Sequence, residues 1–231
     1  MIALLDTIAE FDRSLFLYLN GGHTPFRDAV MTFFTGTAFW ILFYVPLIYF
    51  ILKKYGVKAI VILVLLALAI LVSDQSANLV KDTVQRLRPT HDPGIRHLVH
   101  HVVTKGGQYS FFSSHASNTF TVAVFTAFLF RNYRYTLTIL SWATLVSYTR
   151  IYLGLHYPSD ILAGMTVGIL LGYGIYKFLM FLEKYFLLLR SPKIIDTHLE
   201  NKELAYVEII LGTMILTTFL IVNRLQHFNW I

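Results

Sequence analysis

The stretch AVMTFFTGTAFWILFYVPLIYFIL, residues 29–52, carries no charged side chain over 24 residues. About 20 predominantly apolar residues are enough for one helix to cross the hydrocarbon core of a bilayer. The stretch therefore predicts a membrane-spanning helix. Only 14% of the 231 residues are charged, whereas a soluble domain carries about 25%. We expect lipid, not water, to surround most of this chain.

Five shorter apolar segments follow, each of 15 or 16 uncharged residues: 59–73, 116–130, 135–149, 161–176 and 209–223. Because they fall short of a full span, their ends must include polar groups that reach the interface or face a cavity. Together with 29–52 they predict an all-α integral membrane protein, a six-helix transmembrane bundle. Six spans use nearly the whole length, so we expect one domain over 1–231 with its last span at about 205–223.

The N-terminal segment has a different pattern. Apolar residues recur there at helical spacing, with charged residues between them: Leu4, Leu5, Ile8, Phe11, Leu15 and Leu19. This periodicity predicts an N-terminal amphipathic helix that lies in the membrane interface.

The net charge of +6 also occurs in proteins that bind nucleic acid. In a membrane protein, basic residues instead gather in cytoplasmic loops or meet anionic lipids and substrates. We therefore expect membrane lipids as partners and no nucleic acid. The chain has no cysteine, which excludes disulfides and thiolate chemistry. The sequence does not determine the oligomeric state.

Three segments are too polar for their apolar surroundings. The first is LVSDQSANLVKDTVQRLRPT, residues 71–90. Its polar residues are spaced four, three, four and three apart, which predicts one stripe along a helix: Asp74, Asn78, Lys81, Gln85 and Arg88. Pro89 disfavours helix at the residue before it, so we expect the helix to end at Arg88. A polar stripe at membrane depth normally faces the protein interior.

The second polar segment is YSFFSSHASNTF, residues 109–120. Either Ser113 or Ser114 can cap the helix that follows, and the first free backbone N–H groups would then point outward. With His115 beside them, they would form an anion site. A serine cap and a single histidine are also ordinary structural features, so this segment alone decides little.

The third polar segment is YTRIYLGLHYPSDILAG, residues 148–164. Arg150 ends one span, and Pro158 opens the next with Asp160 in its first turn. Asp160 stands four residues after His156, so it can accept a hydrogen bond from one ring nitrogen and leave the other free. A nucleophilic or basic histidine requires such a pair.

The spacing of the three segments resembles the three-part signature of the type 2 phosphatidic acid phosphatase family, which includes glucose-6-phosphatase and the vanadium haloperoxidases. The matching positions are Lys81-x6-Arg88-Pro89, Ser113-Ser114-His115 and Arg150-x5-His156-x3-Asp160. The resemblance covers roughly residues 15–180, including FLYLNG at 16–21. Phe112 and Ser114 stand where the family has proline and glycine, and Thr149 stands where it has serine.

The resemblance implies a role for each matching residue. His156 attacks phosphorus and becomes phosphorylated, Asp160 orients it, and His115 protonates the leaving group. The remaining residues bind the phosphoryl oxygens: Lys81, Arg88 and Arg150 through their charges, Ser113 and Ser114 through nearby backbone N–H groups. Three cations around one phosphate stabilise its charge without magnesium, so we expect neither a metal nor a cofactor.

The implied activity is metal-independent hydrolysis of a lipid phosphate monoester or pyrophosphate. Undecaprenyl pyrophosphate, lipid A phosphate and phosphatidylglycerol phosphate are the candidate substrates. A lipid phosphotransferase that uses the same histidine is one alternative, and a non-catalytic anion-binding membrane protein is another. With the site cations set aside, ten basic residues fall on one side of the six spans and six on the other. The more basic side should be cytoplasmic, which places the site on the periplasmic face of a bacterial inner membrane.

Two further patterns have structural explanations. Gly164, Gly168 and Gly172 recur every four residues and predict a close helix-packing face. Histidines crowd the loop 91–101 without a carboxylate fixed by spacing: His91, His97, His100 and His101. We expect no metal there. The loop could recognise a head group together with Arg96 and Lys105, although the sequence leaves its role open.

Overall fold

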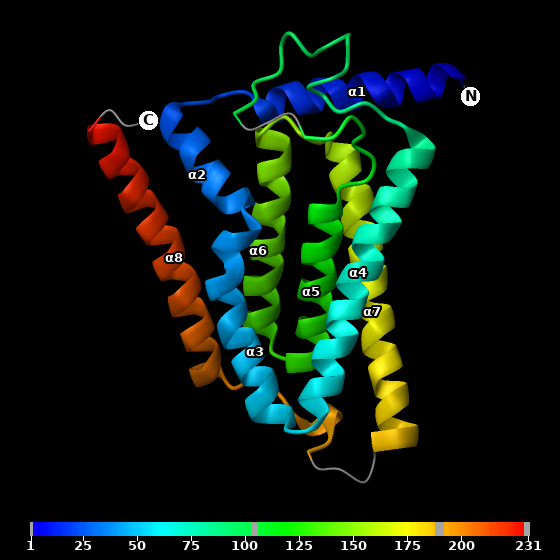
Figure 1. Cartoon of the computed structure of the whole chain (residues 1–231), viewed down its shortest axis with the longest axis vertical. Coiled ribbons are helices and arrows are strands. Elements are labelled where there is room, and N and C mark those ends of the chain that lie inside the picture. The colour runs from blue at the N-terminus through cyan, green and yellow to red at the C-terminus, as the bar shows by residue number, and fades with distance from the viewer. Residues whose placement is uncertain (1, 103–105, 188–191, 229–231) are drawn as a thin grey trace.

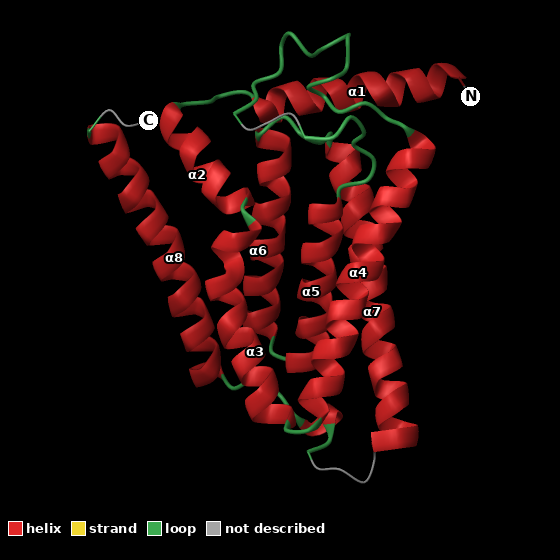
Figure 2. Cartoon of the chain, in the orientation of Figure 1, coloured by secondary structure: helices red, strands yellow, loops and turns green. Residues whose placement is uncertain are grey.

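The computed structural model describes residues 2–102, 106–187 and 192–228, and the regular structure in these residues is helical (Figures 1 and 2). The all-α prediction is therefore confirmed. The α-helices are α1 (Ile2–Asn20), α2 (Pro25–Thr35), α3 (Ile41–Tyr55), α4 (Lys58–Val84), α5 (Ser114–Phe130), α6 (Tyr133–Tyr152), α7 (Pro158–Leu182) and α8 (Asn201–His227). Short 3₁₀ or π turns occupy Thr37–Trp40, Glu183–Leu187 and Ile194–Asp196.

Four helical segments are long and apolar enough to cross a membrane: Thr37–Tyr55, Lys58–Val84, Pro158–Phe186 and Asn201–His227. Large apolar side chains such as Leu42, Leu79 and Leu170 are exposed on their outer faces, as expected of surfaces that contact lipid. The chain is thus a multi-pass membrane protein. Helix α5 lies among the other helices (Figure 1) and has only 17 residues, many of them buried.

The first apolar stretch is not one continuous helix, so that part of the prediction was wrong. Helix α2 ends at Thr35, and Gly36 adopts an extended conformation (φ −71°, ψ 120°) before α3 begins. The end of a helix leaves carbonyl groups without partners. One of them, on Phe34, accepts a hydrogen bond from the indole of Trp40 at 2.8 Å, which stabilises the break.

The predicted continuation of α4 to Arg88 was also wrong. The helix ends at Val84, and Gln85 terminates it in the left-handed conformation (φ 53°) with its N–H bonded to the carbonyl of Lys81. The following loop pairs with itself, because the backbone N–H of Arg88 donates to the carbonyl of Gln108 at 3.0 Å. Arg88 is therefore positioned by a loop, not by a polar stripe on the helix.

Helices α5 and α7 pack backbone to backbone, and this confirms the predicted glycine face. A Cβ at Gly164 would lie 2.5 Å from the carbonyl oxygen of Ser113, and one at Gly168 only 2.4 Å from that of Ser117. In lipid, close packing of this kind holds helices together, since burial of apolar surface gives little advantage there. The contact joins the N-terminal ends of α5 and α7, where the polar segments begin.

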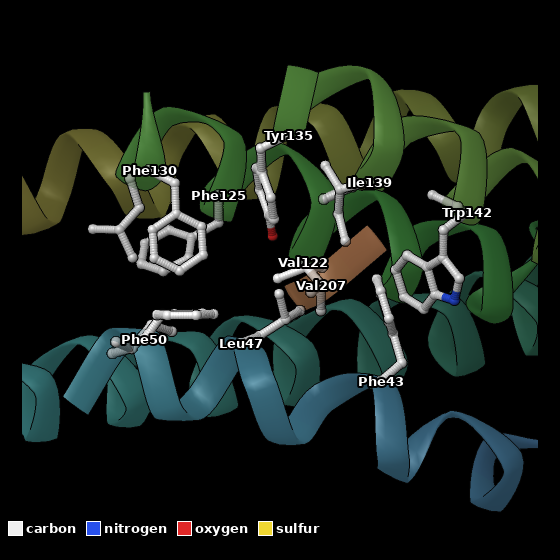
Figure 3. Close-up of a cluster of buried hydrophobic side chains, with 14 of the residues drawn as sticks. Phe43, Leu47, Phe50, Val122, Phe125, Phe130, Tyr135, Ile139, Trp142 and Val207 are labelled. Atoms are coloured by element: carbon white, nitrogen blue, oxygen red, sulfur yellow. The ribbon is translucent and has the colours of Figure 1, made fainter. Parts of the chain in front are cut away.

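The larger apolar core lies between α3, α5 and α6 (Figure 3). Phe43 and Leu47 of α3 face Trp142 and Ile139 of α6. A hydrogen bond from the Tyr135 hydroxyl to Thr126 Oγ1, 2.8 Å long, satisfies the polar group that this aromatic residue brings into the core. This part of the bundle supports the polar end without contributing charged groups.

Helix α1 lies across one end of the bundle (Figure 1). Its buried face includes Asp12, Phe16 and Asn20. The apolar residues Phe11 and Tyr18 point outward instead, with 68% and 81% of their surfaces exposed. One face of α1 therefore packs on the protein through polar contacts and through Phe16, while Phe11 and Tyr18 are free to contact the surrounding lipid or water.

Candidate active site

The eight residues singled out from the sequence come from four helices and the loops beside them, which meet beneath α1 (Figure 1). His115, in the first turn of α5, has Arg150, His156, Lys81 and Arg88 as its electrostatic neighbours. Residues that are up to 79 positions apart along the chain thus form one cluster. Its members are placed by the end of α4, the loop after it, the N-termini of α5 and α7, the last turn of α6 and the loop between α6 and α7.

His156 is held between a cation and a carboxylate. Its Nε2 lies 3.1 Å from Nη1 of Arg88. A guanidinium can only donate, so Nε2 is the acceptor and the ring proton is on Nδ1. Nδ1 lies 3.6 Å from Oδ2 of Asp160 and has no hydrogen-bond partner within the described part of the chain. The predicted pair is therefore adjacent, but this distance is longer than a hydrogen bond.

The environment of His156 favours its neutral form. The side chain is 2% exposed. Burial lowers the pKa of the imidazole to about 4; Asp160 opposes this change, while Arg88 and Arg150 add to it. A neutral ring whose Nε2 lone pair faces a group of cations is the form that can attack an electrophilic phosphorus atom.

The three cations are fixed by different contacts. Arg88 donates from Nε to the carbonyl of Gly107 at 2.6 Å and from Nη1 to that of Leu155 at 2.8 Å. Arg150 donates to Thr35 Oγ1 at 2.6 Å, and its Nε has no partner among residues that the structure describes. The cluster thus concentrates positive charge in a partly buried place, which suits a phosphate dianion.

The N-terminus of α5 forms another part of the site. The structure selects Ser113 as the cap, since its side chain accepts a hydrogen bond from the backbone N–H of Ala116 at 3.4 Å. Ser114 begins the helix and accepts a hydrogen bond from Nζ of Lys81, also at 3.4 Å. The free N–H groups of this first turn lie beside the cations, so both can bind the same anion.

Sequence reasoning missed Arg86 and Asp12. Arg86 donates to Asp160 Oδ1 at 2.8 Å and to Asp12 Oδ2 at 2.6 Å. Asp12 in turn accepts a hydrogen bond from the backbone N–H of Ser159 at 2.9 Å. No spacing rule connects Arg86 with either partner, since Asp160 and Asp12 each lie 74 positions away along the chain. The contacts tie α1 to the N-terminus of α7 and balance the charge of Asp160.

The histidine-rich loop has a structural use at one position. His100 contacts both carboxylate oxygens of Asp28 at 3.0 Å, and its ring stacks on His23 with 3.5 Å between the centroids. These contacts hold the loop against α2. His97 is exposed, and Lys105 lies outside the described residues. Within the described ranges, no three His, Cys, Asp or Glu side chains are grouped so as to hold a metal ion.

The chain resembles proteins of a known family. Residues 57–184 match the sequence model of the PAP2 superfamily. Over 220 residues, the chain is 36% identical to the lipid A 4'-phosphatase of Bacteroides thetaiotaomicron, covering 93% of this chain and 95% of that protein. It is also 36% identical to the lipid A 4'-phosphatase of Porphyromonas gingivalis over 176 residues, 75% of each chain.

A solved structure shares the fold. The transmembrane PAP2 type phosphatidylglycerolphosphate phosphatase of Bacillus subtilis superimposes with a TM-score of 0.60 at 22% identity, covering 78% of this chain and 89% of that one. The resemblance seen in the three sequence segments is confirmed, and the chain belongs to the PAP2 superfamily.

Proposed function

We propose that this chain hydrolyses the phosphate monoester of a membrane lipid through a phosphohistidine at His156, with lipid A 4'-phosphate as its substrate. One observation carries the proposal: the neutral ring of His156 turns Nε2 toward Arg88 at 3.1 Å, inside a group of cations. The relatives named as lipid A 4'-phosphatases support the substrate, because one of them matches over 93% of this chain.

The reaction has two steps. In the first, Nε2 of His156 attacks phosphorus, the bond from phosphorus to the ester oxygen breaks, and His115 gives a proton to the departing oxygen. In the second, water attacks the phosphohistidine and gives a proton to His115, so that inorganic phosphate and the free histidine result. Asp160 stabilises the positive charge that the imidazole gains when Nε2 becomes bonded to phosphorus.

The cations bind the charge of the transferred group. Lys81, Arg88 and Arg150 would each contact an equatorial phosphoryl oxygen, and the first turn of α5 would contribute backbone N–H groups. Phosphoryl transfer depends mainly on such positioning and charge stabilisation. We therefore propose that the reaction needs neither a metal nor a cofactor. Full activity in EDTA is expected; loss of activity that magnesium restores would contradict this.

The placement in the membrane is part of the proposal. Helices α5 and α6 would cross the bilayer with α4, α7, α8 and the α2–α3 pair, six crossings in all, in a bacterial inner membrane. The exposed Phe11 and Tyr18 of α1 suit the interface on the periplasmic side. A reporter active only in the periplasm should be active when fused near Gly106 and silent when fused near Lys54. The reverse pattern would place the site in the cytoplasm.

Purified protein in detergent tests the activity. Lipid A 4'-phosphate, undecaprenyl pyrophosphate and phosphatidylglycerol phosphate are supplied separately, and inorganic phosphate is measured, with His156→Gln as the control. We expect the largest kcat/KM for the lipid A substrate. A larger kcat/KM for another lipid would contradict the proposed substrate. Phosphate found on a second lipid instead of in solution would indicate a transferase.

A further inference from the structure

An apolar cavity of about 410 Å³ extends from the catalytic cluster into the bundle. His115 lines one end of it, and Leu47, Leu66 and Val122 line its walls on α3, α4 and α5. Ile48, which is 43% exposed, also lines it. The cavity thus joins the site to the lipid-facing surface beside α3, and it can hold part of an acyl chain of a lipid whose phosphate lies at His115.

Two polar atoms in this apolar wall have no hydrogen-bond partner among the residues that the structure describes. They are Oδ1 of Asn118 and Nε1 of Trp142, and both residues line the cavity. In Figure 3 the indole nitrogen of Trp142 lies on the edge of the ring that faces away from Ile139 and Tyr135. Buried polar groups are nearly always paired, and an unpaired one is especially costly where water is scarce.

The two atoms have complementary hydrogen-bonding characters. An amide oxygen such as Asn118 Oδ1 only accepts, and an indole nitrogen such as Trp142 Nε1 only donates. A hydroxyl group can satisfy either of them, since it both donates and accepts. A plain alkyl or prenyl chain can satisfy neither. A chain that carries a hydroxyl would therefore suit this lining better than a plain chain.

The positions of the two residues indicate where that hydroxyl would lie. Asn118 is three residues beyond His115 on α5, about 4.5 Å along the helix axis. Trp142 is eight residues before Arg150 on α6, about 12 Å along its axis. Both lie deeper in the bundle than the phosphate-binding cluster. A group that contacts them belongs to the first part of the chain, near the head group.

We propose that Asn118 and Trp142 form a subsite that binds a hydroxyl on an acyl chain of the lipid phosphate, and so selects hydroxyacylated lipids over unsubstituted ones. The proposal rests on the proposed lipid phosphatase function and adds a specificity element to it. The subsite acts on binding of the chain and takes no part in the transfer of phosphate.

Two synthetic N-acyl-glucosamine 4-phosphates of equal chain length test the subsite, one with a β-hydroxyacyl chain and one with the unsubstituted chain. Phosphate release by the purified full-length protein gives kcat/KM for each. We expect the wild type to prefer the hydroxyacyl lipid by about tenfold, the contribution of one hydrogen bond. The ratio of the two values is the readout, because it does not depend on the amount of active protein.

Asn118→Leu removes the acceptor, and Trp142→Phe removes the donor while keeping an aromatic ring. Each should bring the ratio towards one, mainly by slowing hydrolysis of the hydroxyacyl lipid. Leu66→Ala is the matched control, because it enlarges the same cavity without changing its polarity. The kcat/KM values for the two lipids should therefore change by the same factor, and their ratio should stay as in the wild type.

The results that would contradict the subsite differ from those that would contradict the phosphatase function. Equal values for the two lipids in the wild type, or a preference that survives both substitutions, would overturn the subsite and leave the phosphatase function intact. If the wild type hydrolysed neither lipid and released phosphate only from a prenyl pyrophosphate, the proposed lipid A activity and the subsite would both be wrong.

Discussion

Arg86 forms a salt bridge with Asp160: its Nη1 lies 2.8 Å from Oδ1 of the carboxylate. The other carboxylate oxygen, Oδ2, lies 3.6 Å from Nδ1 of His156, the proposed nucleophile. The second guanidinium nitrogen of Arg86 contacts Asp12 of α1 at 2.6 Å. The orientation of Asp160 therefore depends on an arginine from a loop and, through it, on the N-terminal helix.

This relationship predicts that Arg86→Gln lowers kcat by about 10²-fold, because small displacements of a positioning group have effects of that size. KM should change little, since Arg86 is a positioning residue that does not face the phosphate. Arg86→Lys, which keeps the charge, should recover part of the loss. Steady-state kinetics on the lipid substrate measure both constants. Arg134→Gln, which removes an exposed pair with Glu208, is the control and should behave as wild type. An unchanged kcat in Arg86→Gln would exclude the positioning role.

Replacing the proposed nucleophile tests the mechanism. His156→Gln should lower turnover by a factor on the order of 10⁴ or more, the loss seen when a nucleophile is removed. Radiolabelled phosphate trapped on the protein by acid-free quenching should disappear in this variant. It should persist in His97→Gln, which changes an exposed loop histidine. Normal turnover or undiminished labelling in His156→Gln would rule out the phosphohistidine.

His115 can be tested through the leaving group. An alkoxide needs a proton as it departs, whereas p-nitrophenolate needs it far less. The loss of turnover caused by His115→Ala should therefore be about 10–100-fold larger with the lipid monoester than with p-nitrophenyl phosphate. His156→Ala should reduce both reactions alike, because nucleophilic attack is common to them. If His115 only binds phosphate, its replacement will slow both substrates equally.

The buried imidazole of His156 predicts a pH dependence of stability. Its pKa in the folded protein is about 4, below the ordinary value of 6.5. Between these values the unfolded chain binds a proton that the folded protein does not, so stability is lost as the pH falls from 6.5 towards 4. His156→Gln removes this difference. When the pH is lowered from 7 to 5, the apparent melting temperature of this variant should therefore fall less than that of the wild type. Parallel decreases would show that His156 is not the group responsible.

The contact between α5 and α7 predicts a sharp difference between two glycines of one helix. A Cβ at Gly168 would lie 2.4 Å from the carbonyl oxygen of Ser117, whereas one at Gly174 would meet nothing within 4 Å. Gly168→Ala should destabilise the protein by about 1–3 kcal/mol through overpacking. Gly174→Ala should be neutral or stabilise by up to about 1 kcal/mol, because alanine favours helix. Thermal unfolding in detergent compares them, and equal melting temperatures would contradict the close approach.

Local patterns correctly predicted several structural features around the candidate site. Ser113 caps α5, Pro158 begins α7, and the three glycines form its packing face. These features depend on residues within one or two turns of each other, where helix geometry fixes which side chains are neighbours. The same rules failed at helix ends. They extended α4 to Arg88 and joined α2 to α3 across Gly36, because termini depend on which polar groups outside the helix satisfy its backbone.

By itself, the sequence determined that the chain is helical and that it lies in a membrane, since apolarity and helical spacing are local properties. The resemblance of its three polar segments to a known family also singled out charged residues that the structure brings together. Only the tertiary structure decided how Arg86 and Asp12 reach Asp160, which way the ring of His156 faces, and that Asn118 and Trp142 share a cavity. Each of these depends on contacts between helices far apart in the chain. Such contacts follow from how the whole bundle packs, which no spacing along the sequence encodes.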